Sequence, residues 1–252
     1  MMDKTDLFCF SPTGGTAEVG RTFADAMADV IEFVDLCRNG PVSDPGDRIA
    51  VFAAPVFAGR LPPVAAERIR SVDGHGRIAI SLVVYGTRAY DDTLLELNDI
   101  LAERGFTVIA SGAFVAEHSI VRSVGPGRPD GRDSDDIVGF AGKVLAKIGR
   151  RDTTVPSVPG NRPYRPDFAA SSHPVTSDGC TLCGRCAKVC PVGAITIEND
   201  DVVTDEGSCF MCMACVKACP ERVRNLPAPV METMTAKLGP LASVRRPNET
   251  FL

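Results

Sequence analysis

The first 150 residues alternate between short, almost wholly apolar runs and segments in which apolar positions recur every three or four residues. The apolar runs indicate strands that are buried on both faces, and the other period is typical of amphipathic helices. The predicted strands are residues 5–10, 30–36, 48–54, 77–85 and 106–115. The predicted helices are residues 15–28, 61–70, 90–104 and 134–150, the last with Ser134 as its expected N-cap.

This alternation predicts an α/β fold for residues 1–150. The expected architecture is a doubly wound, five-stranded parallel sheet in the flavodoxin-like order 2-1-3-4-5, with helices on both faces. Ligands of such sheets bind beyond the carboxyl ends of the strands, at the switch point between the first and third strands. We therefore expect the functional residues of this domain in the loops that follow the strands.

The pattern changes after residue 150. Residues 151–175 are rich in proline and predict an extended, semi-rigid linker. Residues 176–226 contain most of the cysteines and predict a small α+β module of the bacterial ferredoxin type. Residues 227–252 form a tail, in which we expect a short helix around residues 230–238.

The composition narrows the class of protein. The length of 252 residues suits one medium domain joined to a small one. The chain is 44% hydrophobic and carries a net charge of −5. The acidic balance argues against nucleic acid or an anionic membrane surface as the main partner. No apolar run approaches the ~20 residues of a membrane span, and no signal peptide is evident, so we expect a cytoplasmic protein.

Eight of the ten cysteines form two copies of the run C-x-x-C-x-x-C-x-x-x-C-P. The other two are Cys9 and Cys37, for which we expect inert thiols. This run is typical of bacterial ferredoxins with two [4Fe–4S] clusters, in which the fourth cysteine ligates the other cluster. The expected ligand sets are Cys180, Cys183, Cys186 and Cys219 for one cluster, and Cys209, Cys212, Cys215 and Cys190 for the other. Disulfides and zinc are alternatives, but zinc usually takes separated C-x-x-C pairs. Thiolate ligands also favour a reducing compartment.

The loop after the first predicted strand combines hydroxyl groups and glycines directly before a helix. Its members are Ser11, Thr13, Gly14, Gly15 and Thr16. Hydroxyls and free N–H groups at a helix start bind anions, so this loop predicts a site for a phosphate monoester. No lysine follows the glycines, which excludes a Walker loop, and no G-x-G-x-x-G follows a strand. A hydroxyl-rich helix cap is the alternative interpretation.

The loops after the third and fourth predicted strands bring glycines and aromatic side chains to the same edge of the sheet. The first loop contains Pro55, Phe57, Ala58, Gly59 and Arg60, and the second contains Tyr85, Gly86, Thr87, Arg88 and Tyr90. A flat flavin ring needs backbone polar atoms at its edge and aromatic faces around it. Together with the phosphate loop, these segments predict a flavin site.

The S-x-T-G-x-T loop, the P-V-F-A-G-R and Y-G-T-R-A-Y segments and the cysteine runs together resemble the flavodoxin-like/ferredoxin fusion proteins of bacteria and archaea, the EFR-type ferredoxin family. The resemblance covers the chain except its tail and implies non-covalent FMN and two [4Fe–4S] clusters. It implies two walls around the ring, one of Phe57, Ala58 and Gly59 and the other of Gly86, Thr87 and Tyr90. It also implies that the peptide at Gly59 turns toward N5 of the reduced flavin. Because the chain has no tryptophan, Phe57 or a tyrosine must provide the stacking.

Three side chains near these loops have two interpretations each. Arg60 and Arg88 either face the edge of the flavin or are solvated. His118 follows the fifth predicted strand and either relays protons or is structural. An edge strand away from the switch point favours the structural role for His118.

These features predict an electron-transfer protein that passes electrons between two [4Fe–4S] clusters and FMN. It would link one-electron and two-electron redox partner proteins. The alternatives are a flavin-dependent reductase of a quinone-like or nitro-like molecule, and a redox sensor. The sequence presents no clear substrate pocket, general acid or nicotinamide site, which favours a carrier. The acidic residues around 200–206 are either solvated or dock a partner with a basic face.

Overall fold

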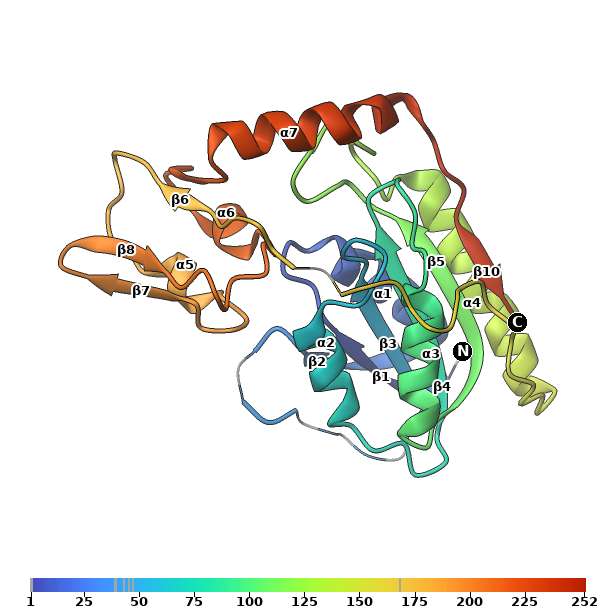
Figure 1. Cartoon of the computed structure of the whole chain (residues 1–252). Coiled ribbons are helices and arrows are strands. Elements are labelled where there is room, and N and C mark those ends of the chain that lie inside the picture. The colour runs from blue at the N-terminus through green and yellow to red at the C-terminus, as the bar shows by residue number, and fades with distance from the viewer. Residues whose placement is uncertain (1, 39, 43, 45, 47, 168) are drawn as a thin grey trace.

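The structure is a computed structural model that describes residues 2–38, 40–42, 44, 46, 48–167 and 169–252. Its centre is a six-stranded sheet in the order β10-β5-β4-β3-β1-β2 (Figure 1). β1 (Met2–Cys9) pairs in parallel with β2 (Ala28–Asp35) and β3 (Ala50–Pro55), and β4 (Ile78–Tyr85) pairs in parallel with β3 and β5 (Thr107–Val115). The parallel strands in the order 2-1-3-4-5 confirm the predicted doubly wound, flavodoxin-like fold.

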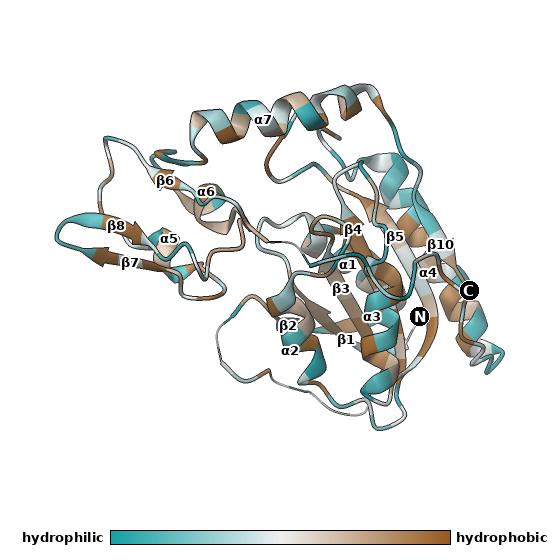
Figure 2. Ribbon diagram, viewed as in Figure 1, coloured by the Kyte–Doolittle hydropathy of each residue, from teal (hydrophilic) through white to brown (hydrophobic). Residues whose placement is uncertain are grey.

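A pair of helices covers each face of the sheet (Figure 1). α1 (Gly15–Met27) and α4 (Gly131–Gly149) pack on one face, where the ring centroids of Phe23 and Phe140 lie 5.4 Å apart. α2 (Pro63–Arg70) and α3 (Thr93–Glu103) pack on the other face. Figure 2 shows hydrophobic strands between helices whose outer faces are hydrophilic. Burial on both faces is the reason that the strands form nearly continuous apolar runs.

The start of α4 differs from the prediction. Ser134 is not its N-cap, because the helix begins at Gly131 and is capped by Asp130. The Asp130 side chain accepts the N–H of Asp133, and the Asp133 side chain accepts the N–H of Asp130 at 2.9 Å. This reciprocal pair satisfies N–H groups that the first helical turn leaves unpaired, and it moves the start of α4 to Gly131.

The described part of the linker predicted for residues 151–175 lies against the flavodoxin-like domain (Figure 1). Arg162 bonds to the carboxylate of Asp99 on α3 at 2.9 Å. The backbone N–H groups of Asn161 and Arg165 donate to the carboxylate of Asp92 at 2.9 and 2.8 Å. The prolines favour an extended backbone, and the contacts with α3 fix the position of the linker on the domain.

The small module consists of two antiparallel strand pairs and two short helices. β6 (Val175–Thr176) pairs with β9 (Arg224–Asn225), and β7 (Ile195–Glu198) forms a hairpin with β8 (Asp201–Thr204). α5 (Arg185–Lys188) contains Cys186, the third cysteine of the first run, and α6 (Ala214–Ala218) contains Cys215, the third cysteine of the second run. The buried cysteines themselves form much of its small core.

The tail returns to the flavodoxin-like domain. α7 (Ala228–Leu238) matches the expected helix, η1 (Gly239–Ser243) follows it, and β10 (Glu249–Phe251) pairs antiparallel with β5. β10 was not predicted, because so short a strand has almost no periodic pattern. It covers backbone groups of β5 that an edge strand would leave unpaired. Among the described residues, no helix has the length and apolar character needed to cross a membrane.

Candidate functional site

A cavity of about 530 Å³ lies where the small module meets the carboxyl ends of β1, β3, β4 and β5. Its walls come from the loops after these strands, the second cysteine run and α7. The volume falls within the range of about 300–1,000 Å³ that is usual for ligand sites, and the place is the switch-point crevice. The predicted flavin-site residues that line it are Thr13, Gly15, Thr16, Pro55, Phe57, Ala58, Gly59, Tyr85, Gly86 and Arg88.

The phosphate loop presents the start of α1 to this cavity. Gly14 is the N-cap residue, with a φ of 97° in the left-handed region that favours glycine, and it has no side chain with which to cap the helix. Thr16 is on the first turn, and only 4% of its surface is exposed. Thr13 and Thr16 line the cavity beside the helix start, which is the arrangement that anions prefer.

The other predicted flavin-site residues, Ser11, Gly14, Thr87 and Tyr90, do not line the cavity. The Ser11 hydroxyl accepts the N–H of Ala17 at 2.9 Å, and the Tyr90 hydroxyl donates to Glu249 of the tail at 2.8 Å. Thr87 is fully buried, and its hydroxyl has no hydrogen-bond partner among the described residues. The side chains of Ser11 and Tyr90 thus hold the loops in shape and do not face the cavity.

Arg60 fits neither of its two interpretations. Its guanidinium pairs with Glu96 at 2.8 Å and with Asp167 at 3.0 Å, and its Cζ lies 4.8 Å from the ring centroid of Tyr164. Arg60 therefore neither faces the flavin edge nor is solvated, because α3 and the linker supply its partners. Arg88 does line the cavity, where it pairs with Asp91.

His118 lies in the wall of the cavity. The prediction that it follows an edge strand was wrong, because β10 covers β5. The imidazole packs against the next loop: a Cβ built on Gly86 would lie 2.6 Å from Cδ2 of His118. Nδ1 of His118 accepts the N–H groups of Ile120 at 3.2 Å and Val121 at 3.1 Å, so it carries no proton. Burial also lowers the pKa of this imidazole. His118 is therefore a neutral donor through Nε2, and its geometry opposes the cationic form that a proton relay needs.

The second cysteine run is packed directly against the predicted flavin loops. The ring centroid of Phe210 lies 5.9 Å from that of Phe57 and 6.3 Å from that of Phe10. The next two residues, Met211 and Cys212, line the cavity. Sequence reasoning missed these contacts, because no pattern within the cysteine run indicates which of its residues face another domain.

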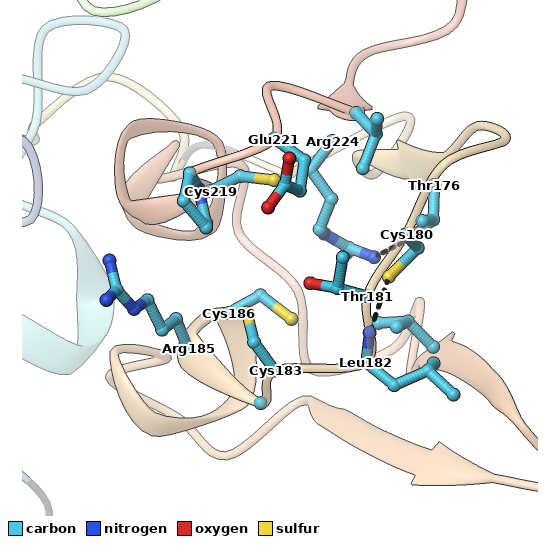
Figure 3. A pocket seen from close by; sticks show the side chains of 14 residues that line it. Thr176, Cys180, Thr181, Leu182, Cys183, Arg185, Cys186, Cys219, Glu221 and Arg224 are labelled. Atoms are coloured by element: carbon cyan, nitrogen blue, oxygen red, sulfur yellow. Dashed lines mark hydrogen bonds between the residues drawn. The ribbon is translucent and has the colours of Figure 1, made fainter.

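The crossed cysteine sets each surround a small cavity inside the module. Figure 3 shows the first of these cavities, with the sulfur atoms of Cys183, Cys186 and Cys219 around it and Cys180 at its side. The second cavity is lined by Cys190, Cys209, Cys212 and Cys215. Within the described ranges, no three His, Cys, Asp or Glu side chains are grouped to hold a single metal ion. Each set of four cysteines lines the wall of one space, an arrangement that fits a [4Fe–4S] cluster.

The thiols of these sets differ in acidity. Burial raises the pKa of Cys212 to about 12. For Cys219, burial also acts to raise the pKa, but the backbone N–H groups of Val223 and Arg224 hold it below the ordinary value. Metals bind thiolates and not thiols, so metal binding by these cysteines would release protons and depend on pH.

Outside the motifs, Cys9 is buried and Cys37 is half-buried. The sulfur of Cys37 accepts the N–H of Ser11 at 3.1 Å, and burial raises its thiol pKa to about 12. Both thiols are protonated at neutral pH, which agrees with the expectation that they are inert.

Residues 176–223 match the 4Fe-4S dicluster domain family. The structure is similar to a flavodoxin of Streptococcus pneumonia TIGR4, with 19% identity, a TM-score of 0.44, and 57% of this chain and 99% of that one covered. It is similar to a Fusobacterium nucleatum flavodoxin bound to flavin mononucleotide, with 14% identity, a TM-score of 0.40, and coverage of 58% and 99%.

A third similar structure is rubredoxin oxygen:oxidoreductase from the anaerobe Desulfovibrio gigas, with 16% identity and a TM-score of 0.43. The match covers 59% of this chain and 36% of that one. No curated protein matches the sequence. The strand order defines a flavodoxin-like α/β domain, and the chain joins this domain to a 4Fe–4S dicluster domain. An iron–sulfur domain of this type supports a role in electron transfer.

Proposed function

We propose that this chain transfers electrons between FMN bound in the large cavity and two [4Fe–4S] clusters held by the crossed cysteine sets. It thereby links redox proteins that exchange one electron with partners that exchange two. The observation that carries the proposal is the shared wall: Cys212, a ligand of one cluster, lines the same cavity as Thr16 and Phe57. Cofactors held by these residues are direct neighbours.

The lining of the cavity supports FMN in particular. Thr13 and Thr16 with the start of α1 offer hydroxyl and N–H donors to one phosphate, without the lysine that a nucleotide triphosphate needs. The loops at Phe57 and Tyr85 supply an aromatic ring on two sides, and Gly59 and Gly86 allow close approach of the backbone. Bound FMN supplies the ability to take two electrons and release them one at a time.

The arrangement also implies an order for the relay. Only Cys212 of the cluster ligands lines the large cavity, whereas Cys180 and Cys183 are exposed on the module. We therefore assign the exchange with a partner protein to the cluster of Cys180, and the exchange with the flavin to the cluster of Cys212. The exposed acidic tip of the β7–β8 hairpin suits a partner with a basic face.

A kinetic experiment on the intact, anaerobic protein tests the proposal. After loading with iron, sulfide and FMN, a substoichiometric pulse of a one-electron reductant is applied, and the flavin and cluster absorbances are followed. We expect electrons to distribute between clusters and flavin in a first-order step whose rate is independent of protein concentration. A rate that rises in proportion to protein concentration shows transfer between molecules and refutes the proposal, as does failure of the loaded protein to retain FMN.

A second candidate function is the reduction of a small molecule at the flavin, with the clusters as its electron supply. The observation that favours it is the apolar wall that α7 adds to the cavity through Val230, Met234 and Leu238. Saturable reduction of a quinone-like or nitro-like acceptor, with turnover that falls on Met234→Ala, supports this candidate. Unchanged, non-saturable reduction in both proteins excludes it.

A further inference from the structure

The two cysteine runs are structural copies as well as sequence copies. Leu182 and Met211 hold equivalent positions after the first cysteine of each run, and their φ angles are 52° and 55°. Continuing the alignment past the fourth cysteine, the fifth residue after Cys190 is Ile195, and the fifth after Cys219 is Arg224. Ile195 is an apolar core residue with 6% of its surface exposed. The second copy therefore places an arginine at a position that the first copy fills with an apolar side chain.

Arg224 is nevertheless buried, with 2% of its surface exposed. Nη1 donates to the Thr176 hydroxyl at 2.8 Å, and Nη2 donates to the Pro174 carbonyl at 2.9 Å and to the Thr204 hydroxyl at 2.7 Å. All of these acceptors are neutral oxygen atoms. Nε is buried and has no hydrogen-bond partner among the described residues. Burial of a guanidinium among neutral oxygen acceptors is costly unless an anion lies beside it.

The positive charge faces the space of both clusters. Arg224 lines the cavity of Cys180, Cys183, Cys186 and Cys219, where Figure 3 shows it beside Cys219 and Thr176, and it also lines the cavity of Cys190, Cys209, Cys212 and Cys215. Cys186 lies in the first of these cavities and Cys215 in the second. One cation is thus shared between ligands of the two sets.

We propose that Arg224 is the common counter-charge of the two clusters and makes both of them easier to reduce. The inference rests on the proposed function, because it requires that both cysteine sets hold clusters. Each reduction adds one negative charge to a cluster, so a fixed cation in the same dry interior stabilises the reduced form more than the oxidised form. Net charge and hydrogen bonds to sulfur are the means by which proteins set cluster potentials.

A pair of variants separates the charge from the hydrogen bonds. Arg224→Lys keeps a cation but loses the planar fork, and Arg224→Gln keeps N–H donors but loses the charge. Arg222→Gln removes an exposed cation from the same loop and serves as the control. Each loaded protein is titrated electrochemically under anaerobic conditions, after iron content and the cluster absorbance have been measured.

We expect Arg224→Gln to lower the equilibrium constant for reduction of each cluster by about tenfold or more, a fall of about 59 mV or more in each midpoint potential. Arg224→Lys and Arg222→Gln should stay within about threefold of the original protein. Loss of clusters in Arg224→Gln alone also supports the charge role. Equal behaviour of the lysine and glutamine variants, whether equal potentials or equal loss of iron, overturns it. An original protein that binds no clusters refutes the proposed function instead, and iron analysis distinguishes that outcome.

Discussion

Replacing Thr13 and Thr16 together by alanine removes the hydroxyl donors of the phosphate loop while leaving its backbone in place. Both side chains line the large cavity, and Thr16 is almost fully buried there. A hydrogen bond to a charged group contributes about 1.5–3 kcal/mol. Loss of two such bonds to a phosphate therefore costs about 3–6 kcal/mol, which weakens FMN binding by about 10²–10⁴-fold. No lysine in the loop compensates for the loss.

The assay is a fluorescence titration of the flavin-free protein with FMN, together with iron analysis of the same sample. Iron content should not change, because the cysteine sets lie in the other domain. Thr22→Ala is the matched control: Thr22 lies on the same helix, and its hydroxyl donates to the Glu18 carbonyl at 2.9 Å, away from the cavity lining. If the double variant binds FMN within about threefold of the original protein, the loop is only a helix cap and the assigned phosphate site is wrong.

The cluster, histidine and carboxylate assignments give further predictions. Cys212→Ala should lower iron from about eight to about four atoms per chain while Cys37→Ala lowers it not at all, and unchanged iron in Cys212→Ala contradicts the ligand set. His118→Met should weaken FMN binding by about 3–12-fold relative to His118→Gln, which keeps a donor near the Nε2 position, and equal affinities show that the Nε2 donor does not contact the flavin. For Asp133, burial acts to raise the pKa, but the Arg128 ion pair and further hydrogen bonds hold it below the ordinary 3.8. Its contribution to stability is thus complete above that value and is lost as the pH falls through the lower folded pKa. Thermal unfolding from about pH 7 to about pH 3 should show a steeper acid loss for the original protein than for Asp133→Asn, and identical profiles contradict this.

Much of the fold was predictable because its signals are local. Buried parallel strands require apolar residues on both faces, so β3 and β4 are evident as unbroken hydrophobic runs. The short β10 was not predictable, since its place in the sheet depends on the bonds of Asn248 to Val115 and Asp133 and not on its own sequence. The cap of α4 was missed for a related reason: Asp130 and Ser134 are both suitable residues, and the reciprocal bond with Asp133 decides between them.

The residues of the candidate site likewise include some that were predictable from sequence and some that were not. Spacing within each cysteine run, and glycines and hydroxyls within one loop, are constraints between neighbouring residues, so the ligand sets and the phosphate loop could be proposed from sequence. The direction of a loop side chain depends on which distant segment packs against it. The Arg60 side chain points toward Glu96 and the linker. The His118 imidazole is oriented by the N–H groups of Ile120 and Val121, which donate to its Nδ1.

By itself, the sequence determined the class of each domain and the chemistry of the cysteine runs, because helical and strand periods and metal-ligand spacing are properties of contiguous segments. Only the tertiary structure decided that Cys212 shares a cavity with the phosphate loop and that α7 covers it. It also decided that Arg224 lies between the two cysteine sets, where the aligned position of the first run holds an isoleucine. Such juxtapositions result from packing between segments far apart in the chain, and packing free energy depends on surfaces that exist only once the chain has folded.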